Sequence, residues 1–484
     1  MSQHANVCLK SSFTDSADST ELNCKVNDSI ACDHLQNIID DFVLPGVLSS
    51  EEKNDLIEVA AILINEYISE DSTIFMDPGF HEDVMEAVFK LIEIQLENAF
   101  DYDISEEVED IIKEAISLFY IHIAPKRSYS DTFICKKCNH EKMKSKVEYL
   151  ENVPQPEQRT AEWYNFRHNL LTASSIWKAF GSQATVNQLV YDKCAPLDIT
   201  RYSRFSTESP MHWGNKYEPV SIMWYEKEYN TVVSDFGCIP HKTIPYLAAS
   251  PDGINTCESS ERHGRMLEVK NIVNRDITGI PKVEYWIQMQ VQMEVCMLNE
   301  CDFLETRFTE YEGYNEFNDD GDFTMSEDGK LKGIVLYFIK GGQPFYEYAP
   351  LGISKEEFND WEKMIMTKNK DITWMQNLYW KLSEISCVLV LRNKLWFSGA
   401  EPILDDLWSV IEKEKVSGYE HRAPKRKQST KISVVKEIVP SKCYINVQNL
   451  LNENIETDHS TIVKTNSPSP TNINKVINID TERF

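Results

Sequence analysis

The sequence predicts a mixed α/β core, with a central sheet flanked by helices, between an acidic helical N-terminal domain and a helical C-terminal extension. Helical and extended apolar patterns alternate between residues 158 and about 350, which is typical of a sheet covered by helices. Residues 1–125 hold 27 of the 77 acidic and 5 of the 49 basic residues, so they carry −22 of the net charge of −28. Apolar residues return to helical spacing from 355 to 415.

Three amphipathic helices are expected in the acidic region. Apolar residues recur every three or four positions from Leu56, from Val84 and from Val108, as one buried helix face requires. Ser49, Ser50 and Glu51 provide the first of these helices with a start signal. The chain is polar at both ends, which favours disorder there. We expect a disordered N-terminus at 1–35, an acidic helical domain at 36–125, a basic linker with a Cys-x2-Cys pair at 126–157, the core at 158–350, a helical extension at 351–415 and a disordered polar tail at 416–484.

The core is expected to begin with two short helices, capped by Thr160 and Thr172. A longer helix follows, and then several extended runs are separated by Pro and Gly, the residues that commonly punctuate strands. The expected elements are a helix over 211–229, extended runs over 231–239, 246–250 and 266–272, a helix over 283–298, and strands over 303–309 and 333–339.

Composition excludes several classes of protein. With 484 residues and 42% hydrophobic content, the chain is long and apolar enough to form large cores, which excludes disorder throughout. We find no signal peptide and no membrane-spanning segment, so we expect a soluble, intracellular protein with no membrane partner, whose twelve scattered cysteines are reduced. The net charge opposes bulk attraction to nucleic acid. Any attraction to DNA must therefore come from a local arrangement of cations.

The sharpest chemical feature is Asp252, at a Pro-Asp-Gly bend, followed by Glu268-Val269-Lys270 in an apolar strand. Side chains two apart on a strand share a face, so Glu268 and Lys270 should lie together, with Asp252 reaching them from the neighbouring bend. Two carboxylates suit a hard divalent cation, and a lysine can orient the nucleophile or offset negative charge in the transition state. The triplet taken alone is more often an ordinary salt bridge at a strand edge, so its surroundings have to decide.

The surroundings of this triplet resemble the YqaJ-type viral recombinases, the lambda-exonuclease-like family of the PD-(D/E)xK nuclease superfamily. The resemblance covers about residues 158–310 and implies a restriction-endonuclease-like core. Four blocks in the family's order carry it: Trp163-x3-Arg167 with Thr172-Ala173-Ser174, Gly214-x3-Glu218, Ser250-Pro251-Asp252-Gly253 with Glu268-Val269-Lys270, and Tyr285-x2-Gln288-x-Gln290.

The resemblance also implies roles for individual residues. Asp252 and Glu268 would bind Mg²⁺ or Mn²⁺, with two ions expected, and the backbone carbonyl of Val269 would be a further ligand. Lys270 would be the catalytic lysine. The other implied positions are Glu218 near the second metal or its waters, Gln288 near the attacking water, and Arg167, Ser174 and Ser250 in a pocket for the 5′-phosphate of a DNA end.

The resemblance implies a magnesium-dependent 5′–3′ exodeoxyribonuclease that acts on linear double-stranded DNA and leaves 3′ single strands for viral DNA recombination, repair or replication. Its expected partners are DNA with a 5′-phosphate end and a single-strand-annealing protein. The family also suggests a homotrimer, although the acidic extension has no counterpart in that pattern. If the protein is viral, its location is the host cytoplasm or nucleus.

Two other functions stay open. A restriction-like or structure-selective endonuclease would use the same metal site. A non-catalytic recruitment module would instead use the acidic N-terminal region to bind a partner.

A second metal site is suggested by Cys135-x2-Cys138, which has the spacing of half a structural zinc site. The sequence has no second Cys-x2-Cys pair downstream. The remaining ligands would have to be isolated residues such as Cys194 or His168, and a solvated basic linker without zinc is the alternative.

Overall fold

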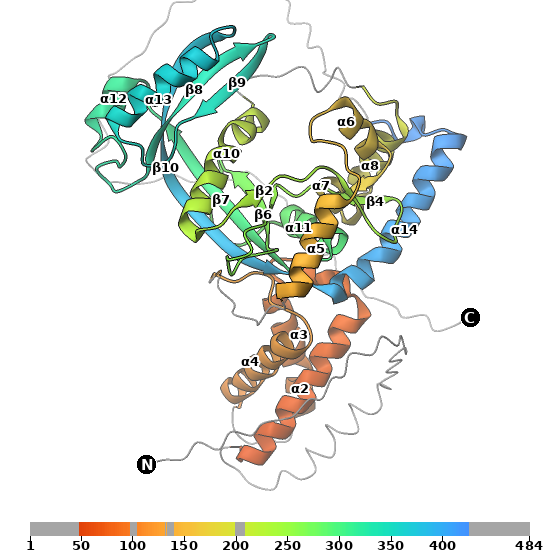
Figure 1. The fold of residues 1–484 in the computed structure, drawn as a ribbon. Coiled ribbons are helices and arrows are strands. Elements are labelled where there is room, and N and C mark those ends of the chain that lie inside the picture. Colours follow the sequence, from red (N-terminus) through yellow and green to blue (C-terminus); the bar gives the residue numbers. More distant parts are fainter. Residues whose placement is uncertain (1–47, 97–103, 131, 133–139, 199–208, 425–484) are drawn as a thin grey trace, which may run out of the picture. The chain divides into compact units, whose positions relative to one another are not determined.

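The computed structural model describes residues 48–96, 104–130, 132, 140–198 and 209–424 (Figure 1). The expected disordered N-terminus at 1–35, most of the expected tail at 416–484 and the Cys135/Cys138 pair lie outside these residues. None of the helices in the described ranges is both long and apolar enough to cross a membrane.

The acidic region folds into the three expected helices, with a short 3-10 helix after the first. Ser49 and Glu52 form a reciprocal capping box: the Ser49 N–H donates to Glu52 Oε2 at 2.6 Å, and the Glu52 N–H donates to the Ser49 hydroxyl at 3.3 Å. Each helix buries one apolar face, which agrees with the periodicity of the sequence. The elements are α2 (Ser50–Glu70), η1 (Ser72–Met76), α3 (Phe80–Leu96) and α4 (Ser105–His122).

The segment 126–157, expected to be a linker, contains a helix, α5 (His140–Asn152), that packs on the core. Its apolar side buries Val147 and Leu150. Lys146 also donates a hydrogen bond to the Met297 carbonyl at 2.6 Å. This part of the chain therefore belongs to the folded structure instead of acting as a spacer.

A seven-stranded mixed sheet forms the centre of the core (Figure 1). The strand order is β2-β5-β6-β7-β10-β8-β9, and the β6–β7 pair is parallel while its other neighbouring pairs are antiparallel. The chain crosses from β6 to β7 through helix α11, because parallel neighbours cannot be joined by a tight turn. The elements are β2 (Val233–Ser234), β5 (Gly253–Asn255), β6 (Met266–Asn271), α11 (Val283–Cys296), β7 (Glu300–Glu310), α12 (Tyr314–Asp319), β8 (Lys332–Lys340), β9 (Gln343–Tyr348) and β10 (Thr373–Leu391).

The two faces of β6 contact different helices. Leu267 and Val269 pack in a cluster with Tyr225 of α10 (Pro210–Tyr229), whereas Met266 belongs to the large cluster that contains the apolar residues of α11. Because side chains alternate along a strand, Glu268 and Lys270 share the face covered by α11. The expected same-face arrangement of these two residues is therefore present.

A small second sheet positions the first half of the core. β1 (Leu171–Thr172) runs parallel to β4 (Leu247–Ala249), and β3 (Ile239–Pro240) pairs with β4 on its other side. The parallel pairing brings the residues after β1 close to the residues after β4, because both strands end at the same edge. The helices of this part are α6 (Ala161–His168), α7 (Ala173–Ile176), η2 (Trp177–Phe180) and α8 (Gln183–Cys194).

The expected helical extension over 351–415 is wrong in its central part. α13 (Lys355–Lys368) and α14 (Lys394–Ser417) are helical, but β10 lies between them and is inserted in the main sheet between β7 and β8. The end of β10 is a continuous buried apolar run, and such a run does not by itself distinguish a buried strand from a helix.

The expected start of the disordered tail, at 416, is also too early. α14 continues to Ser417, and η3 (Glu420–Arg422) follows it. Arg422 anchors this end of the described chain, since its guanidinium donates to both carboxylate oxygens of Glu414 at 2.5 Å.

Candidate active site

Asp252 lies at the bend between β4 and β5, directly before a glycine that the structure requires. A Cβ atom on Gly253 would lie 2.1 Å from Cγ1 of Val233, so no larger residue fits between β2 and β6. Gly253 pairs with Leu267 of β6. This register brings Asp252 alongside β6, where its Oδ2 accepts a hydrogen bond from the Val269 N–H at 2.8 Å.

The Glu268 carboxylate is fully buried and is surrounded by donors. Its Oε1 accepts hydrogen bonds from Gln288 Nε2 at 2.7 Å and from the Lys270 ammonium. Its Oε2 accepts from Gln292 Nε2, also at 2.7 Å. A buried carboxylate needs such partners, because losing its hydration without them costs several kcal/mol. β6 and α11 together therefore fix this carboxylate in one position.

The charged groups of this cluster shift one another's pKa values. Burial raises the pKa of Asp252 well above its ordinary value, and the neighbouring Glu268 carboxylate raises it further. Burial also opposes the charge of Lys270, but Glu268 and Asp252 outweigh it and raise the pKa of Lys270. In the metal-free protein, these two carboxylates therefore favour the ammonium form of Lys270.

Glu218 on α10 is a third carboxylate near this cluster. Burial raises its pKa, Arg159 and Lys270 oppose that effect, and the charge of Glu268 adds to it. Arg159 Nη2 lies 3.6 Å from Glu218 Oε2. Within the described ranges, no three His, Cys, Asp or Glu side chains gather closely enough to hold one metal ion.

The chemistry of Asp252 and Glu268 nevertheless fits a divalent cation. Their oxygens are hard donors of the kind that Mg²⁺ prefers. The pKa of Asp252 is raised first by burial and then by repulsion from Glu268, and a bound cation would oppose both effects by favouring the charged carboxylate. The carbonyl of Val269 and water would have to supply further ligands.

The Arg167 pocket, defined as Arg167, Ser174 and Ser250, is assembled by the small sheet. The Arg167 guanidinium donates to the Ser250 hydroxyl and to the Ser174 hydroxyl, both at 2.9 Å. It also lies over the Trp163 ring, 4.2 Å from the ring centroid. The three residues expected to form one pocket are thus brought together, from the end of α6, from α7 and from the end of β4.

Lys193 is a cation of this region that the sequence did not single out. It is buried on α8, and its ammonium donates to the Arg167 carbonyl at 2.7 Å. Burial, and then the positive charge of Arg167, lower the pKa of Lys193 to about 7. A lysine inside a helix pattern gives no local sign of such burial, so the sequence alone could not identify it.

The glutamines of α11 divide between two tasks. Gln288 and Gln292 both donate to the Glu268 carboxylate. Gln290 points elsewhere, donating to the Leu391 carbonyl at 3.0 Å and accepting from the Asn393 N–H at 2.7 Å. The spacing of four residues between Gln288 and Gln292, which puts both on one helix face, is the signal that could have identified Gln292.

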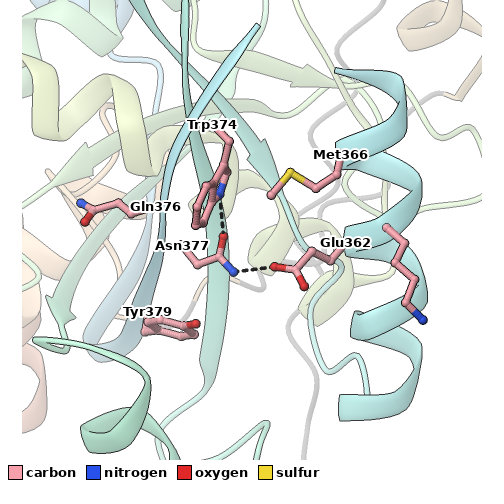
Figure 2. Close-up of a pocket in the computed structure, with 7 residues that line it drawn as sticks. Glu362, Met366, Trp374, Gln376, Asn377 and Tyr379 are labelled. Carbon is pink, nitrogen blue, oxygen red and sulfur yellow. Dashed lines mark hydrogen bonds between the residues drawn. The ribbon is translucent and has the colours of Figure 1, made fainter. Parts of the chain in front are cut away.

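A cavity of about 470 Å³ lies away from these residues, between α13 and the first half of β10. Figure 2 shows Trp374 donating to Asn377, which in turn donates to Glu362. Three of its polar lining residues are thus linked by hydrogen bonds. The lining consists of Glu362, Lys363, Met366, Trp374, Gln376, Asn377 and Tyr379, none of which belongs to the site described above.

Residues 162–310 match the family model of the YqaJ-like viral recombinase domain. We call this stretch the YqaJ-like domain, after the family to which it is similar. The YqaJ-like domain contains the carboxylates, Lys270 and the Arg167 pocket, and it ends with β7, so that β8, β9 and β10 lie beyond the match. The match agrees with the resemblance expected from the sequence, over about the same residues.

The chain is also similar to individual proteins, at 13% to 29% identity. Uncharacterized protein R354 of Acanthamoeba polyphaga mimivirus is 29% identical over 381 residues, covering 69% of this chain and 67% of the relative. The solved alkaline exonuclease LHK-Exo from Laribacter hongkongensis has 18% identity and a TM-score of 0.31, covering 54% of this chain and 100% of that one. A phage related exonuclease from Haemophilus somnus 129PT has 13% identity and a TM-score of 0.28, covering 52% of this chain and 96% of that one. The likeness to the mimivirus protein extends beyond the YqaJ-like domain, since more residues align than that domain contains.

Replacing Asp252 with Asn should stabilise the metal-free protein at pH 8. The raised pKa of Asp252 means that the folded protein keeps a proton which the unfolded chain loses above about pH 4, so the free energy of unfolding of the wild type falls as pH rises toward the folded pKa. The advantage of Asp252→Asn should be small at pH 4 and grow with pH. Each unit by which folding raises the pKa of Asp252 would contribute about 1.4 kcal/mol to the difference in the free energy of unfolding.

Urea unfolding in a chelating buffer from pH 4 to pH 8 measures this difference. Adding Mg²⁺ should stabilise the wild type and have little effect on Asp252→Asn. Asp276→Asn, at an exposed carboxylate, is the matched control and should behave as the wild type. A stability difference that does not change with pH would contradict the prediction.

Proposed function

We propose that the protein is a magnesium-dependent 5′–3′ exodeoxyribonuclease that digests linear double-stranded DNA and leaves 3′ single strands for viral DNA recombination, repair or replication. One observation supports it most directly. Ser250 links the carboxylates to the Arg167 pocket: its hydroxyl accepts from Arg167 at 2.9 Å, and its carbonyl accepts from Gln292, which also holds Glu268. A bound 5′-phosphate would therefore lie beside the hydrolytic site.

Asp252, Glu268 and the Val269 carbonyl would hold the metal ions, with Glu218 acting through water. Bound Mg²⁺ would polarise the phosphodiester and lower the pKa of a bound water. Gln288 and Gln292 keep Glu268 in one rotamer, and the Val269 N–H orients Asp252. Lys270, held as an ammonium, would offset the negative charge that develops on the attacked phosphate.

The Arg167 pocket has the chemistry to recognise a terminal phosphate. A planar guanidinium can hold a phosphate through two parallel hydrogen bonds, and the hydroxyls of Ser174 and Ser250 can donate two more. A phosphomonoester carries more negative charge than an internal phosphodiester, so a cationic pocket favours a DNA end over the interior of a strand. This argument favours an exonuclease over the alternative endonuclease.

The remaining expectations rest on the family resemblance. They are a homotrimer, a single-strand-annealing partner, and a location in the host cytoplasm or nucleus. The non-catalytic recruitment module remains the rival proposal, although partner binding by the acidic helices would not in itself exclude nuclease activity, because those helices lie outside the YqaJ-like domain.

Replacing Glu268 with Gln should reduce the digestion of linear DNA by about 10²- to 10³-fold or more, because it removes a negative charge from the expected metal site. The assay compares linear duplexes with covalently closed circles, with and without Mg²⁺, and circular dichroism checks folding. Glu228→Gln, on the exposed side of α10, should keep full activity. Comparable activity in folded Glu268→Gln would contradict the assignment, and cutting of closed circles by the wild type would favour an endonuclease.

Replacing Arg167 with Ala should remove most of the preference for 5′-phosphorylated over 5′-hydroxylated ends. A hydrogen bond to a charged group contributes about 1.5 to 3 kcal/mol, so kcat/KM on phosphorylated ends should fall by roughly 10- to 100-fold. Arg167→Lys keeps the charge but loses the planar guanidinium. Its preference for phosphorylated ends should lie between those of the wild type and Arg167→Ala. The rate on 5′-hydroxyl ends is the internal control. An unchanged ratio in Arg167→Ala would exclude the pocket as the phosphate site.

The preference for a 5′-phosphate should weaken as pH rises through 7. Lys193 has a pKa of about 7, so below that pH its ammonium adds to the positive charge around Arg167 and above it this charge is lost. The ratio of kcat/KM for phosphorylated and hydroxylated ends, measured from pH 6 to pH 8.5, should fall about tenfold in the wild type. The same ratio should change little with pH in Lys193→Met. A wild-type ratio that is independent of pH would contradict this role.

A further inference from the structure

Arg159 is a cation beside the carboxylates to which the proposed nuclease mechanism gives no role. It lies in the chain between α5 and α6, and its side chain is 55% exposed. Its Nη2 lies 3.6 Å from Glu218 Oε2 and donates to Asn215 Oδ1 at 3.4 Å, both on α10. A guanidinium has five N–H donors. Among the described residues, neither Nε nor Nη1 of Arg159 has a hydrogen-bond partner.

The backbone of Arg159 is strained. Its φ is +65°, in the left-handed region that disfavours residues with a Cβ atom. The Thr160 N–H donates to the Glu157 carbonyl at 3.4 Å, so Arg159 is the third residue of a turn, where a positive φ favours glycine. Thr160 is itself fixed as the N-cap of α6, since its hydroxyl accepts from the Trp163 N–H at 3.1 Å. Strained residues of this kind persist where the surroundings hold them, and they cluster at functional sites.

The residue before Arg159 ties this turn to the bend that carries Asp252. Gln158 Nε2 donates to the Phe236 carbonyl at 2.7 Å and to the Pro251 carbonyl at 3.4 Å. Pro251 directly precedes Asp252 in the chain. Arg159 is therefore held between the Asp252 bend on one side and the α10 carboxylate on the other.

The surroundings of Arg159 are acidic. Burial has the largest effect on the pKa of Glu218 and raises it, and the charges of Glu268 and Asp235 raise it further. The positive charge of Arg159 opposes them. Without a cation at this position, the carboxylates would repel a phosphate that approached from the side of α10. Arginine suits the position, because its planar guanidinium stays charged and can bind two anionic groups at once.

We propose that Arg159 binds a backbone phosphate of the DNA strand that enters the site. The inference rests on the proposed function, because its ligand is the DNA substrate. Nε and Nη1 of Arg159 would donate to the phosphate, while Nη2 stays at Glu218. This contact is separate from the Arg167 pocket, which would take the terminal phosphate. It should therefore contribute equally whether the 5′ end is phosphorylated or not.

An ordinary ion pair with Glu218 is the alternative role for Arg159. Exposed ion pairs contribute little to stability, and the separation of 3.6 Å is longer than a hydrogen bond. Such a pair gives no reason to place an arginine where the backbone favours glycine. A phosphate contact gives that reason, because only the side chain of Arg159 supplies a free donor group at this point.

DNA binding by the full-length protein, measured without hydrolysis, tests the proposal. Fluorescence anisotropy follows a labelled linear duplex in a chelating buffer, over a series of KCl concentrations. Arg159→Gly should raise the Kd about tenfold, because it removes hydrogen bonds to a charged phosphate. The slope of log affinity against log salt should become shallower by about 0.9, as expected for one lost phosphate contact. An unchanged Kd and slope would overturn the proposal.

Three comparisons control for folding and for charge. Glycine suits the left-handed backbone, so Arg159→Gly should unfold at a urea concentration no lower than that of the wild type. Arg159→Lys keeps the positive charge and should keep the wild-type salt slope, and a slope as shallow as that of Arg159→Gly would contradict the proposal. Lys90→Ala removes an exposed cation paired with Glu86 on α3 and should change neither Kd nor slope. An equal loss in Lys90→Ala would indicate an effect of total charge and overturn the proposal.

A Glu218→Gln background separates phosphate binding from an effect that acts through Glu218. If Arg159 only neutralised this carboxylate, its removal would matter only while Glu218 is charged. We expect Arg159→Gly to weaken DNA binding about tenfold in Glu218→Gln as well. A loss of affinity that disappears in this background would overturn the proposal.

The outcomes also separate this inference from the proposed function. Failure of the wild type to bind DNA would contradict both. Binding by the wild type, with unchanged affinity in Arg159→Gly, would overturn this inference alone. The ratio of Kd values for 5′-hydroxylated and 5′-phosphorylated ends should be the same in Arg159→Gly as in the wild type. Loss of that preference would place Arg159 at the terminal phosphate and overturn the proposal.

Discussion

The buried carboxylate of Glu268 is the interaction on which the rest of the site depends. Losing its hydration costs several kcal/mol, which the donors from Lys270, Gln288 and Gln292 offset. Those donors come from β6 and α11, so the strand and the helix cannot shift independently. Through Gln292 the same network reaches the Ser250 carbonyl. The carboxylates and the Arg167 pocket are therefore held in one geometry by one set of hydrogen bonds.

The YqaJ-like domain does not contain its whole sheet. The matched residues end with β7. β10 nevertheless pairs with β7 from Glu300 to Glu310, and the sheet continues beyond β10 with β8 and β9. Gln290 of the YqaJ-like domain is bonded to residues at the end of β10 and the start of α14. The flanking chain is consequently part of the support for α11. This connection gives β10 and the start of α14 a structural role in supporting the candidate site.

The net charge of −28 describes mainly the acidic helices and the segments around them. Residues 151–310 contain 21 acidic and 15 basic residues, so the YqaJ-like domain is only mildly acidic. Within it, Arg167, Lys193 and Lys270 gather at the Arg167 pocket and the carboxylates. Local arrangement, and not total charge, therefore decides whether a phosphate is attracted to this surface.

The sequence by itself predicted the likeness to the YqaJ-like family, the mixed core and the residues of the candidate site. These follow from local rules: a two-residue period puts Glu268 and Lys270 on one face, and Pro-Asp-Gly places Asp252 at a bend. Only the tertiary structure decided that β10 is a sheet strand, that Gln292 holds Glu268, and that Lys193 is buried under Arg167. Each of these depends on contacts between segments distant in the chain. Burial and hydrogen-bond partners across such distances leave no periodic trace in either segment, so no local pattern could have revealed them.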